Sequence, residues 1–144
     1  MSIRAIVYER NGNPASVLHA VTLPNSQPLS GGLIRVKVLL SPINPSDLHV
    51  VHGSYAVQPV LREVDVNGQK KTLYLPGNEG LGEVVEAGPD VKSLKSGDWV
   101  VFSKGQCGTW SSAQVLEEQD VIKVDGGSGI SAVSASTLTV SRLI

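Results

Sequence analysis

The sequence LPGNEGLGEVVEAG, at residues 75–88, decides the fold of this chain. It contains a proline and four glycines, and glycine adopts positive φ angles at little energetic cost. These residues therefore predict a backbone that turns tightly or passes close to a neighbouring segment. Residues 83–87, which follow, include two adjacent valines and end at a glycine, a pattern that predicts a short strand.

The spacing Gly77-x-x-Gly80-x-Gly82 is similar to that of a dinucleotide-binding loop, but in reverse order. In that loop a helix follows the glycines, and the N-terminus of the helix holds the pyrophosphate. Because a strand is predicted after the glycines here, we expect a structural turn and not a phosphate-binding loop. Asn78 and Glu79 lie within this turn.

The segments on either side predict a mainly β fold. At residues 33–40, apolar side chains alternate with polar ones, as in a half-buried strand. Residues 60–74 predict an exposed hairpin around Asn67-Gly68, the pair that two-residue hairpin turns favour. Many short strands separated by turns are typical of a barrel or a sandwich. The further predicted strands are residues 5–8, 99–102, 109–116 and 121–124.

Two short pieces before the hairpin carry candidate chemistry, namely INPSD at residues 43–47 and GSY at 53–55. Pro42 and Pro45 define the loop of residues 41–47, and Ser46 and Asp47 are expected to cap a short helix there. Tyr55 follows a glycine–serine turn, where its side chain can face a cleft. A phenol is protonated at neutral pH, so it can donate a proton to a developing enolate.

Composition and charge exclude several classes of protein. The 144 residues suffice for one domain with a core of its own. The formal net charge of −1, without a basic cluster, argues against nucleic-acid or electrostatic membrane binding. No apolar run approaches the roughly 20 residues that span a bilayer. We expect neither a secretory signal nor a mitochondrial presequence, so that in an organelle this would be a mature or edited form.

The cysteine and the histidines favour structural roles. The single cysteine, Cys107, excludes an internal disulfide and a multi-cysteine zinc lobe, and it favours a reducing compartment. No neighbouring base or cation would lower the pKa of its thiol, so we expect a small buried residue. The three histidines have no partners at zinc-ligand spacing, and we expect them at the surface or partly packed. They are His19, His49 and His52.

Asn44 and Asn78 lie in turns where asparagine usually satisfies local backbone groups.

In order along the chain, four segments resemble the amino-terminal GroES-like domain of the medium-chain dehydrogenases/reductases. They are YERNGNPASVL, LLSPINPSDLHVVHGSY, LPGNEGLGEVVEAGPDVKSLKSGDWVV and GTWSSAQV. Within that superfamily they are most similar to the trans-2-enoyl-thioester reductases of mitochondrial fatty-acid synthesis. The resemblance covers nearly the whole chain and implies a GroES-like, partly open β-barrel with short helices.

The resemblance also implies a mechanism. Zinc-dependent members of the superfamily have a cysteine ligand where this chain has Asn44 and a histidine ligand where it has Asn78, so a zinc-free member without a metal site is implied. Tyr55 is then the proton donor, Asn44 lies beside the nicotinamide, and Trp110 helps to wall the substrate-binding cleft. The implied reaction transfers a hydride from NADPH to the β-carbon of an enoyl thioester of CoA or acyl-carrier protein, with protonation at the α-carbon.

A domain boundary follows from the same resemblance. Residues 1–128 correspond to the substrate-side domain, and residues 129–144 to the start of a linker helix leading to an NADPH-binding Rossmann domain, which the sequence lacks. We expect the isolated chain to be inactive, because hydride donor and acceptor must be held together. We also expect the linker to expose apolar surface. The insertion at residues 60–74 leaves the shape of the acyl pocket open.

Three alternatives remain at this stage. The chain is similar to zinc-free quinone reductases too, it fits a non-enzymatic β-barrel that binds a partner through the face a Rossmann domain would cover, and it fits a truncated product without function. The resemblance implies a mitochondrial location, with the cytoplasm as the alternative. A homo-oligomer is expected, and neither a nucleic-acid partner nor a membrane span is.

Overall fold

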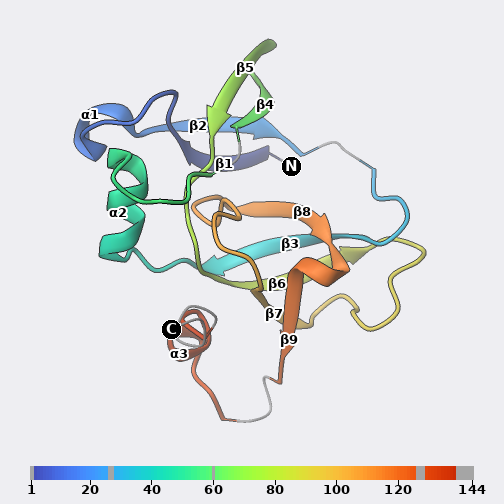
Figure 1. The fold of residues 1–144 in the computed structure, drawn as a ribbon. Coiled ribbons are helices and arrows are strands. Elements are labelled where there is room, and N and C mark those ends of the chain that lie inside the picture. The colour runs from blue at the N-terminus through green and yellow to red at the C-terminus, as the bar shows by residue number, and fades with distance from the viewer. Residues whose placement is uncertain (1, 26–27, 60, 126–128, 139–144) are drawn as a thin grey trace.

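The computed structural model describes residues 2–25, 28–59, 61–125 and 129–138, and its short strands enclose a partly open barrel (Figure 1). The strands are β1 (Ser2–Val7), β2 (His19–Pro24), β3 (Leu33–Leu40), β4 (Leu61–Val66), β5 (Gln69–Tyr74), β6 (Leu81–Ala87), β7 (Trp99–Phe102), β8 (Ala113–Glu117) and β9 (Val121–Val124). The helices are α1 (Pro14–Val17), α2 (Pro45–His52), α3 (Ala132–Ala135) and the 3-10 turn η1 (Glu118–Asp120).

The strands form three antiparallel sheets, in the orders β1-β2, β8-β3-β6-β7-β9 and β4-β5. The alternation in β3 predicts its burial well at first, since Ile34 and Val36 are fully buried. A register shift between Val38 and Leu40 then interrupts the pairing with β6. Such a bulge redirects side chains, and Leu40 is exposed where the simple alternation predicts burial.

Backbone hydrogen bonds join the edges of the sheets. Tyr8 exchanges two of them with Tyr74, at 3.1 and 2.8 Å, and the two rings stack with centroids 4.9 Å apart. On the other side, the amide of Ile6 donates to the carbonyl of Trp110 at 2.9 Å. The described strands do not close into a complete barrel, so the predicted partly open β-barrel is confirmed.

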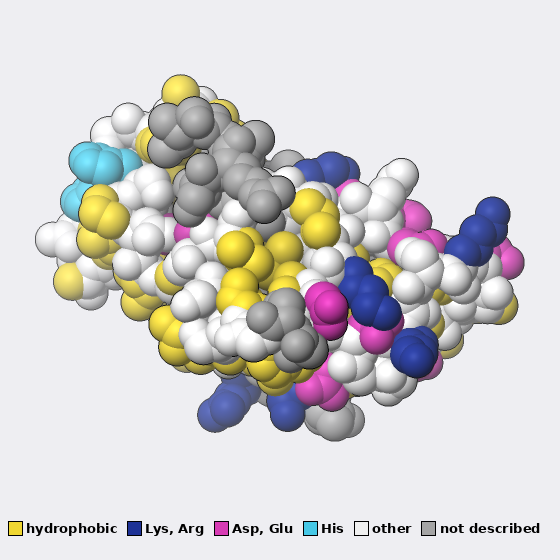
Figure 2. Space-filling model, turned by 90° about the horizontal axis from the view of Figure 1, so that it is seen from below, with side chains coloured by type: hydrophobic (Ala, Val, Ile, Leu, Met, Phe, Trp, Pro, Cys, Tyr) yellow, Lys and Arg dark blue, Asp and Glu magenta, His cyan; other side chains and the backbone are white. Residues whose placement is uncertain are grey.

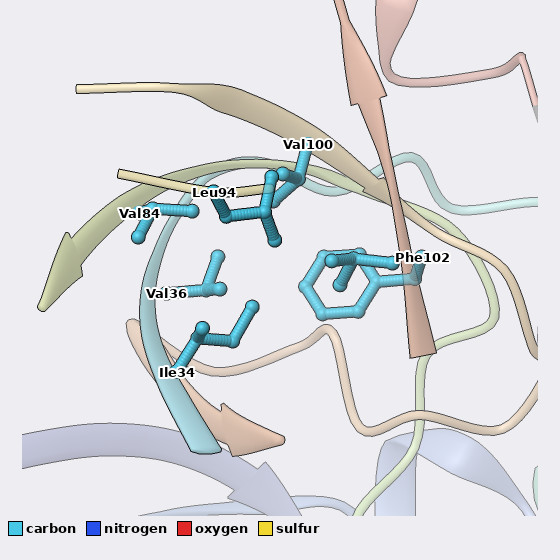
Figure 3. Close-up of a cluster of buried hydrophobic side chains, with 7 residues drawn as sticks. Ile34, Val36, Val84, Leu94, Val100 and Phe102 are labelled. Carbon is cyan, nitrogen blue, oxygen red and sulfur yellow. The ribbon is translucent and has the colours of Figure 1, made fainter. Parts of the chain in front are cut away.

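Apolar side chains fill the barrel in separate clusters. The largest lies inside the five-stranded sheet, where Phe102 of β7 points toward Ile34 and Val36 of β3 (Figure 3). A second cluster lies between the β1-β2 and β4-β5 sheets and includes Val7 and Leu73. Burial of this apolar surface is what stabilises sheets that share few backbone hydrogen bonds.

The predicted hairpin is confirmed in β4 and β5. Asn67 and Gly68 have φ angles of 53° and 80°, which a type I′ turn requires of both central residues. Val66 and Leu73 are buried beneath it. Glu63, Asp65 and Lys70 are exposed, whereas Arg62 is partly buried and donates to Gln114 Oε1 at 3.3 Å. Val60, at the start of the predicted hairpin, lies outside the described residues.

Some boundaries differ from the sequence prediction. The strand expected at residues 109–116 begins only at Ala113, because Ser111 and Gln114 form a turn in which both contact the Gly108 carbonyl. Strand β2 and helix α1 had no periodic signal, since β2 is mostly exposed and α1 is a single turn. Among the described residues, no helix has the length and apolar character needed to cross a membrane.

The C-terminal segment packs on the outside of the five-stranded sheet. Ala135 of α3 is buried with Leu81 and Val101, and Ile130 and Leu138 pack against them. Val133, on the other face of α3, is 69% exposed. Figure 2 shows this side of the molecule, with apolar side chains gathered at its centre and charges of both signs intermixed toward one end. Residues 139–144 of the predicted linker lie outside the described residues, and the boundary at residue 128 stays a prediction.

The loop after β6 gives a pH-dependent prediction. Glu118 accepts hydrogen bonds from the backbone and hydroxyl of Ser93, at 2.7 and 2.6 Å, and from the amide of Lys92 at 3.2 Å. These bonds lower the pKa of the Glu118 carboxyl. The stabilisation is therefore present above the unfolded-state pKa and is lost as the pH falls through the folded-state pKa.

We expect urea denaturation between pH 7 and pH 3 to show a smaller acid loss of stability in Glu118→Gln than in the wild type. Parallel stability curves for the two proteins would contradict this assignment.

Candidate functional site

The loop after β3 and the loop between β5 and β6 meet at one end of the barrel. The Ser41 hydroxyl donates to the Glu79 carbonyl at 3.0 Å, and it lies 2.9 Å from Thr109 Oγ1. The carbonyl of Gly77 accepts from the amides of Gly108 and Thr109, at 3.2 and 3.4 Å. Three loops from distant parts of the sequence therefore form one surface.

Two asparagines and two carboxylates cross-link these loops. Asn44 Nδ2 donates to Glu79 Oε2 at 2.8 Å, and Asn78 Nδ2 donates to Asp47 Oδ1 at 3.0 Å. We call these four residues the amide–carboxylate network. Both asparagines do more than satisfy local backbone groups, because each side-chain amide donates an N–H to a carboxylate from the other loop. Asn78 Oδ1 also binds backbone, accepting from the Gln106 amide at 2.9 Å.

Helix α2 starts earlier than expected, and this places Asp47. Asn44 is the residue that precedes the helix, Pro45 is its first residue, and Asp47 lies in its first turn. Asp47 Oδ2 accepts the backbone N–H of Asn44 at 2.8 Å, so Ser46 does not begin the helix. Proline suits the first helical position because its missing N–H would have no partner there.

Both carboxylates of the network are buried, Asp47 to 2% and Glu79 to 3% exposure. Burial raises the pKa of the Asp47 carboxyl, and the nearby Glu79 adds to this, while hydrogen bonds from Asn44 and Asn78 act in the opposite direction. Sequence reasoning missed both acids as site residues. The available signals were the position of Asp47 three residues after Asn44 and an acidic residue inside a glycine-rich turn.

The glycine turn is as tight as predicted. Gly77 has a φ of +110°, and a Cβ built there would lie 2.4 Å from Thr109 Oγ1 and 2.7 Å from the Trp110 amide nitrogen. Strand β6 begins at Leu81, directly after Gly80, and includes Gly82, which excludes a helix N-terminus at this turn. The turn is structural, because it lets two loops lie in contact.

Trp110 lies at the edge of an apolar groove of about 440 Å³. Its Nε1–H donates to the Pro42 carbonyl at 3.4 Å, which links it to the loop that carries Asn44. The other lining residues come mainly from β1 and the end of β3, and Ser41 and Thr109 connect the groove to the amide–carboxylate network. The structure thus brings Asn44 and Trp110 onto neighbouring loops.

Tyr55 follows the C-terminal end of α2. The helix ends at Gly53, whose φ of 84° needs glycine, and the chain then bends through Tyr55. The side chain is 44% exposed, and its phenol oxygen has no hydrogen-bond partner among the described residues. No hydrogen bond in the described part of the chain joins Tyr55 to Asn44 or Trp110, and its role stays a prediction.

Residues 30–141 match the alcohol dehydrogenase GroES-like domain. The chain belongs to this family. Its sequence is 37% identical to that of the mitochondrial enoyl-[acyl-carrier-protein] reductase of Xenopus tropicalis, over 100% of this chain and 39% of that protein. It is 38% identical to the human protein of the same name, over 96% of this chain and 34% of that protein. The chain therefore spans little more than a third of these relatives.

Solved structures of enoyl thioester reductases are also similar to this GroES-like domain. It superposes on an enoyl thioester reductase from Candida tropicalis with a TM-score of 0.88 and 30% identity, over 97% of this chain and 41% of that one. A complex of Etr1p with NADP and crotonyl-CoA gives the same score and identity. A putative NADPH:quinone reductase from Bacillus thuringiensis is less similar, with a TM-score of 0.75 and 27% identity, over 99% of this chain and 39% of that one.

The three histidines of the GroES-like domain have no hydrogen bond to the amide–carboxylate network within the described residues. All three are exposed, and His49 Nδ1 lies 3.0 Å from Ser54 Oγ. Within the described residues, no group of three or more His, Cys, Asp or Glu side chains could hold a metal ion. Cys107 is half-buried and not fully buried as expected, and burial raises the pKa of its thiol.

Proposed function

We propose that this chain is the substrate-side domain of an NADPH-dependent trans-2-enoyl-thioester reductase. The observation that carries the proposal is the match over 97% of the chain, at a TM-score of 0.88, to a structure that contains both NADP and crotonyl-CoA. The weaker match to the quinone reductase makes that activity the second candidate. Since the chain spans about two fifths of these structures, the activity belongs to a larger assembly of which it supplies one side.

The residues fit a site that works through hydrogen bonds and proton transfer. At the two positions where zinc-dependent relatives have ligands, this chain has amides that donate to buried carboxylates, so their chemistry does not suit zinc. Tyr55 is the proposed proton donor, because its phenol is exposed and its hydroxyl has no hydrogen-bond partner within the described residues. Trp110 borders the groove beside the site and is proposed to wall the acyl group.

NADPH, when bound, supplies the hydride that reduces the β-carbon of the enoyl thioester. Asn44, which precedes α2 and has a half-exposed side chain, is the residue proposed to contact the nicotinamide end of the cofactor. The phenol proton of Tyr55 goes to the α-carbon, and solvent restores it. One enoyl thioester, one NADPH and one proton thus give one saturated thioester and one NADP⁺. Binding of CoA or acyl-carrier-protein thioesters, assembly into oligomers and a mitochondrial location are proposed from the relatives.

The test uses a chimera in which this chain is joined to the portion of the Xenopus tropicalis relative that its match does not cover. We expect the chimera to oxidise NADPH with crotonyl-CoA at least tenfold faster, in kcat/KM, than with benzoquinone. The isolated chain should oxidise NADPH with neither. Faster quinone reduction would favour the second candidate. A folded chimera that reduces neither compound would leave the chain as a binding module without this activity.

A further inference from the structure

The two asparagines of the amide–carboxylate network form different sets of hydrogen bonds. Asn78 uses both ends of its side chain inside the protein, since Nδ2 donates to Asp47 and Oδ1 accepts from the Gln106 amide. Asn44 is half-exposed, and its Nδ2 donates to Glu79 Oε2 at 2.8 Å. An amide nitrogen has two N–H groups, and within the described residues Glu79 is the one acceptor that contacts Asn44 Nδ2. Asn44 therefore keeps one N–H for a ligand.

The buried acid determines which end of the Asn44 amide is available. Glu79 Oε2 accepts the hydrogen bond from Asn44 Nδ2, so Glu79 holds the NH₂ group of Asn44 and not its oxygen. A rotated amide would place two oxygens in contact inside a buried site, which is unfavourable.

We propose that Glu79 is a positioning residue that orients Asn44 so that its second N–H donates to a carbonyl oxygen of the bound ligand. This rests on the proposed function and extends it, because it names a residue outside the reacting groups and the polarity of the contact. Two ligand carbonyls have this chemistry, the carboxamide of the nicotinamide and the thioester carbonyl of the substrate. A hydrogen bond to either one fixes the orientation of a reactant.

Exchanging the donor and the acceptor between residues 44 and 79 distinguishes a positioning role of Glu79 from a purely structural one. Asn44→Asp alone places two carboxylates against each other and should lower the melting temperature. In Asn44→Asp with Glu79→Gln, the glutamine NH₂ donates to the new carboxylate, so the buried bond and the net charge are restored. Residue 44 then has only oxygens and no N–H for the ligand.

We expect the double variant of the chimera to regain most of the melting temperature lost by Asn44→Asp. It should still show about a tenfold loss in ligand binding, equivalent to one hydrogen bond of about 1.4 kcal/mol. Weaker NADPH binding, with unchanged binding of adenosine 2′,5′-bisphosphate, identifies the nicotinamide carboxamide. Unchanged NADPH binding with a raised KM for crotonyl-CoA identifies the thioester carbonyl. Glu63→Gln, on the exposed hairpin, is the matched control and should change neither.

Recovery of both melting temperature and ligand binding in the double variant would overturn the proposal, because the pair would then be structural only. The isolated chain gives an independent readout by NMR. One Asn44 side-chain proton should exchange slowly with solvent in the wild type and faster in Glu79→Gln, and equal exchange rates would also overturn it. A wild-type chimera that binds NADPH but reduces no enoyl thioester removes the proposed function, while the NADPH comparison still decides on Asn44.

Discussion

Tyr55→Phe is expected to lower the kcat of the chimera with crotonyl-CoA by about 10²- to 10⁴-fold, the range that a general acid contributes. The substitution removes one oxygen and leaves the ring in place. The Tyr55 side chain is 44% exposed and its hydroxyl has no partner among the described residues, so stability should change by less than about 0.5 kcal/mol. Steady-state kinetics together with urea denaturation measure both effects.

The matched control is Tyr74→Phe, the same change in the tyrosine that ends β5 and stacks on Tyr8. Its kcat should stay near that of the wild type. NADPH affinity should be unchanged in Tyr55→Phe, since the phenol acts on the substrate. A kcat within threefold of the wild type would exclude Tyr55 as the proton donor, although its position matches that of the tyrosine in the family.

Gly77→Ala is expected to be the most destabilising single change at the site. The new Cβ would meet Thr109 and the Trp110 backbone at distances that atoms do not adopt, and the φ of +110° strains any side chain. Backbone strain and overpacking together suggest a loss of roughly 3 to 5 kcal/mol. Since a domain is stable by only about 5 to 15 kcal/mol, denaturant melts should show a large shift of the midpoint.

Gly97→Ala separates the two causes. Gly97 has a similar φ of +94°, but a Cβ there meets nothing within 4 Å. It should lose only the strain contribution, roughly 1 to 2 kcal/mol. Equal losses in the two variants would show that close contact of the loops at Gly77 does not stabilise the fold.

The parts of the fold with a local signal were predictable from the sequence. The alternation of residues 33–40 and the Asn67-Gly68 turn fix short-range geometry, and both elements form as expected. Strand β2 was not predictable, because it is mostly exposed and its apolar and polar residues do not alternate. Its extended structure depends on pairing with β1. Leu40 departs from its pattern because of a bulge that depends on β6.

The site was predictable in its residues but not in its contacts. Asn44 and Asn78 are marked by their turns and by family resemblance, and the structure brings them into one network. Their carboxylate partners lie 35 and 31 residues away along the chain, and no local pattern specifies which loops meet. Glu79 and Asp47 become recognisable only when burial and hydrogen bonding are seen together.

The most direct test of the enoyl-reductase assignment is to trace the two transferred hydrogens in the product formed by the chimera from crotonyl-CoA. With NADPH deuterated at the transferred position, in ordinary water, mass spectrometry should find butyryl-CoA with one deuterium at the β-carbon. With unlabelled NADPH in heavy water, the deuterium should be at the α-carbon. Absence of butyryl-CoA from a folded chimera that binds NADPH would contradict the account.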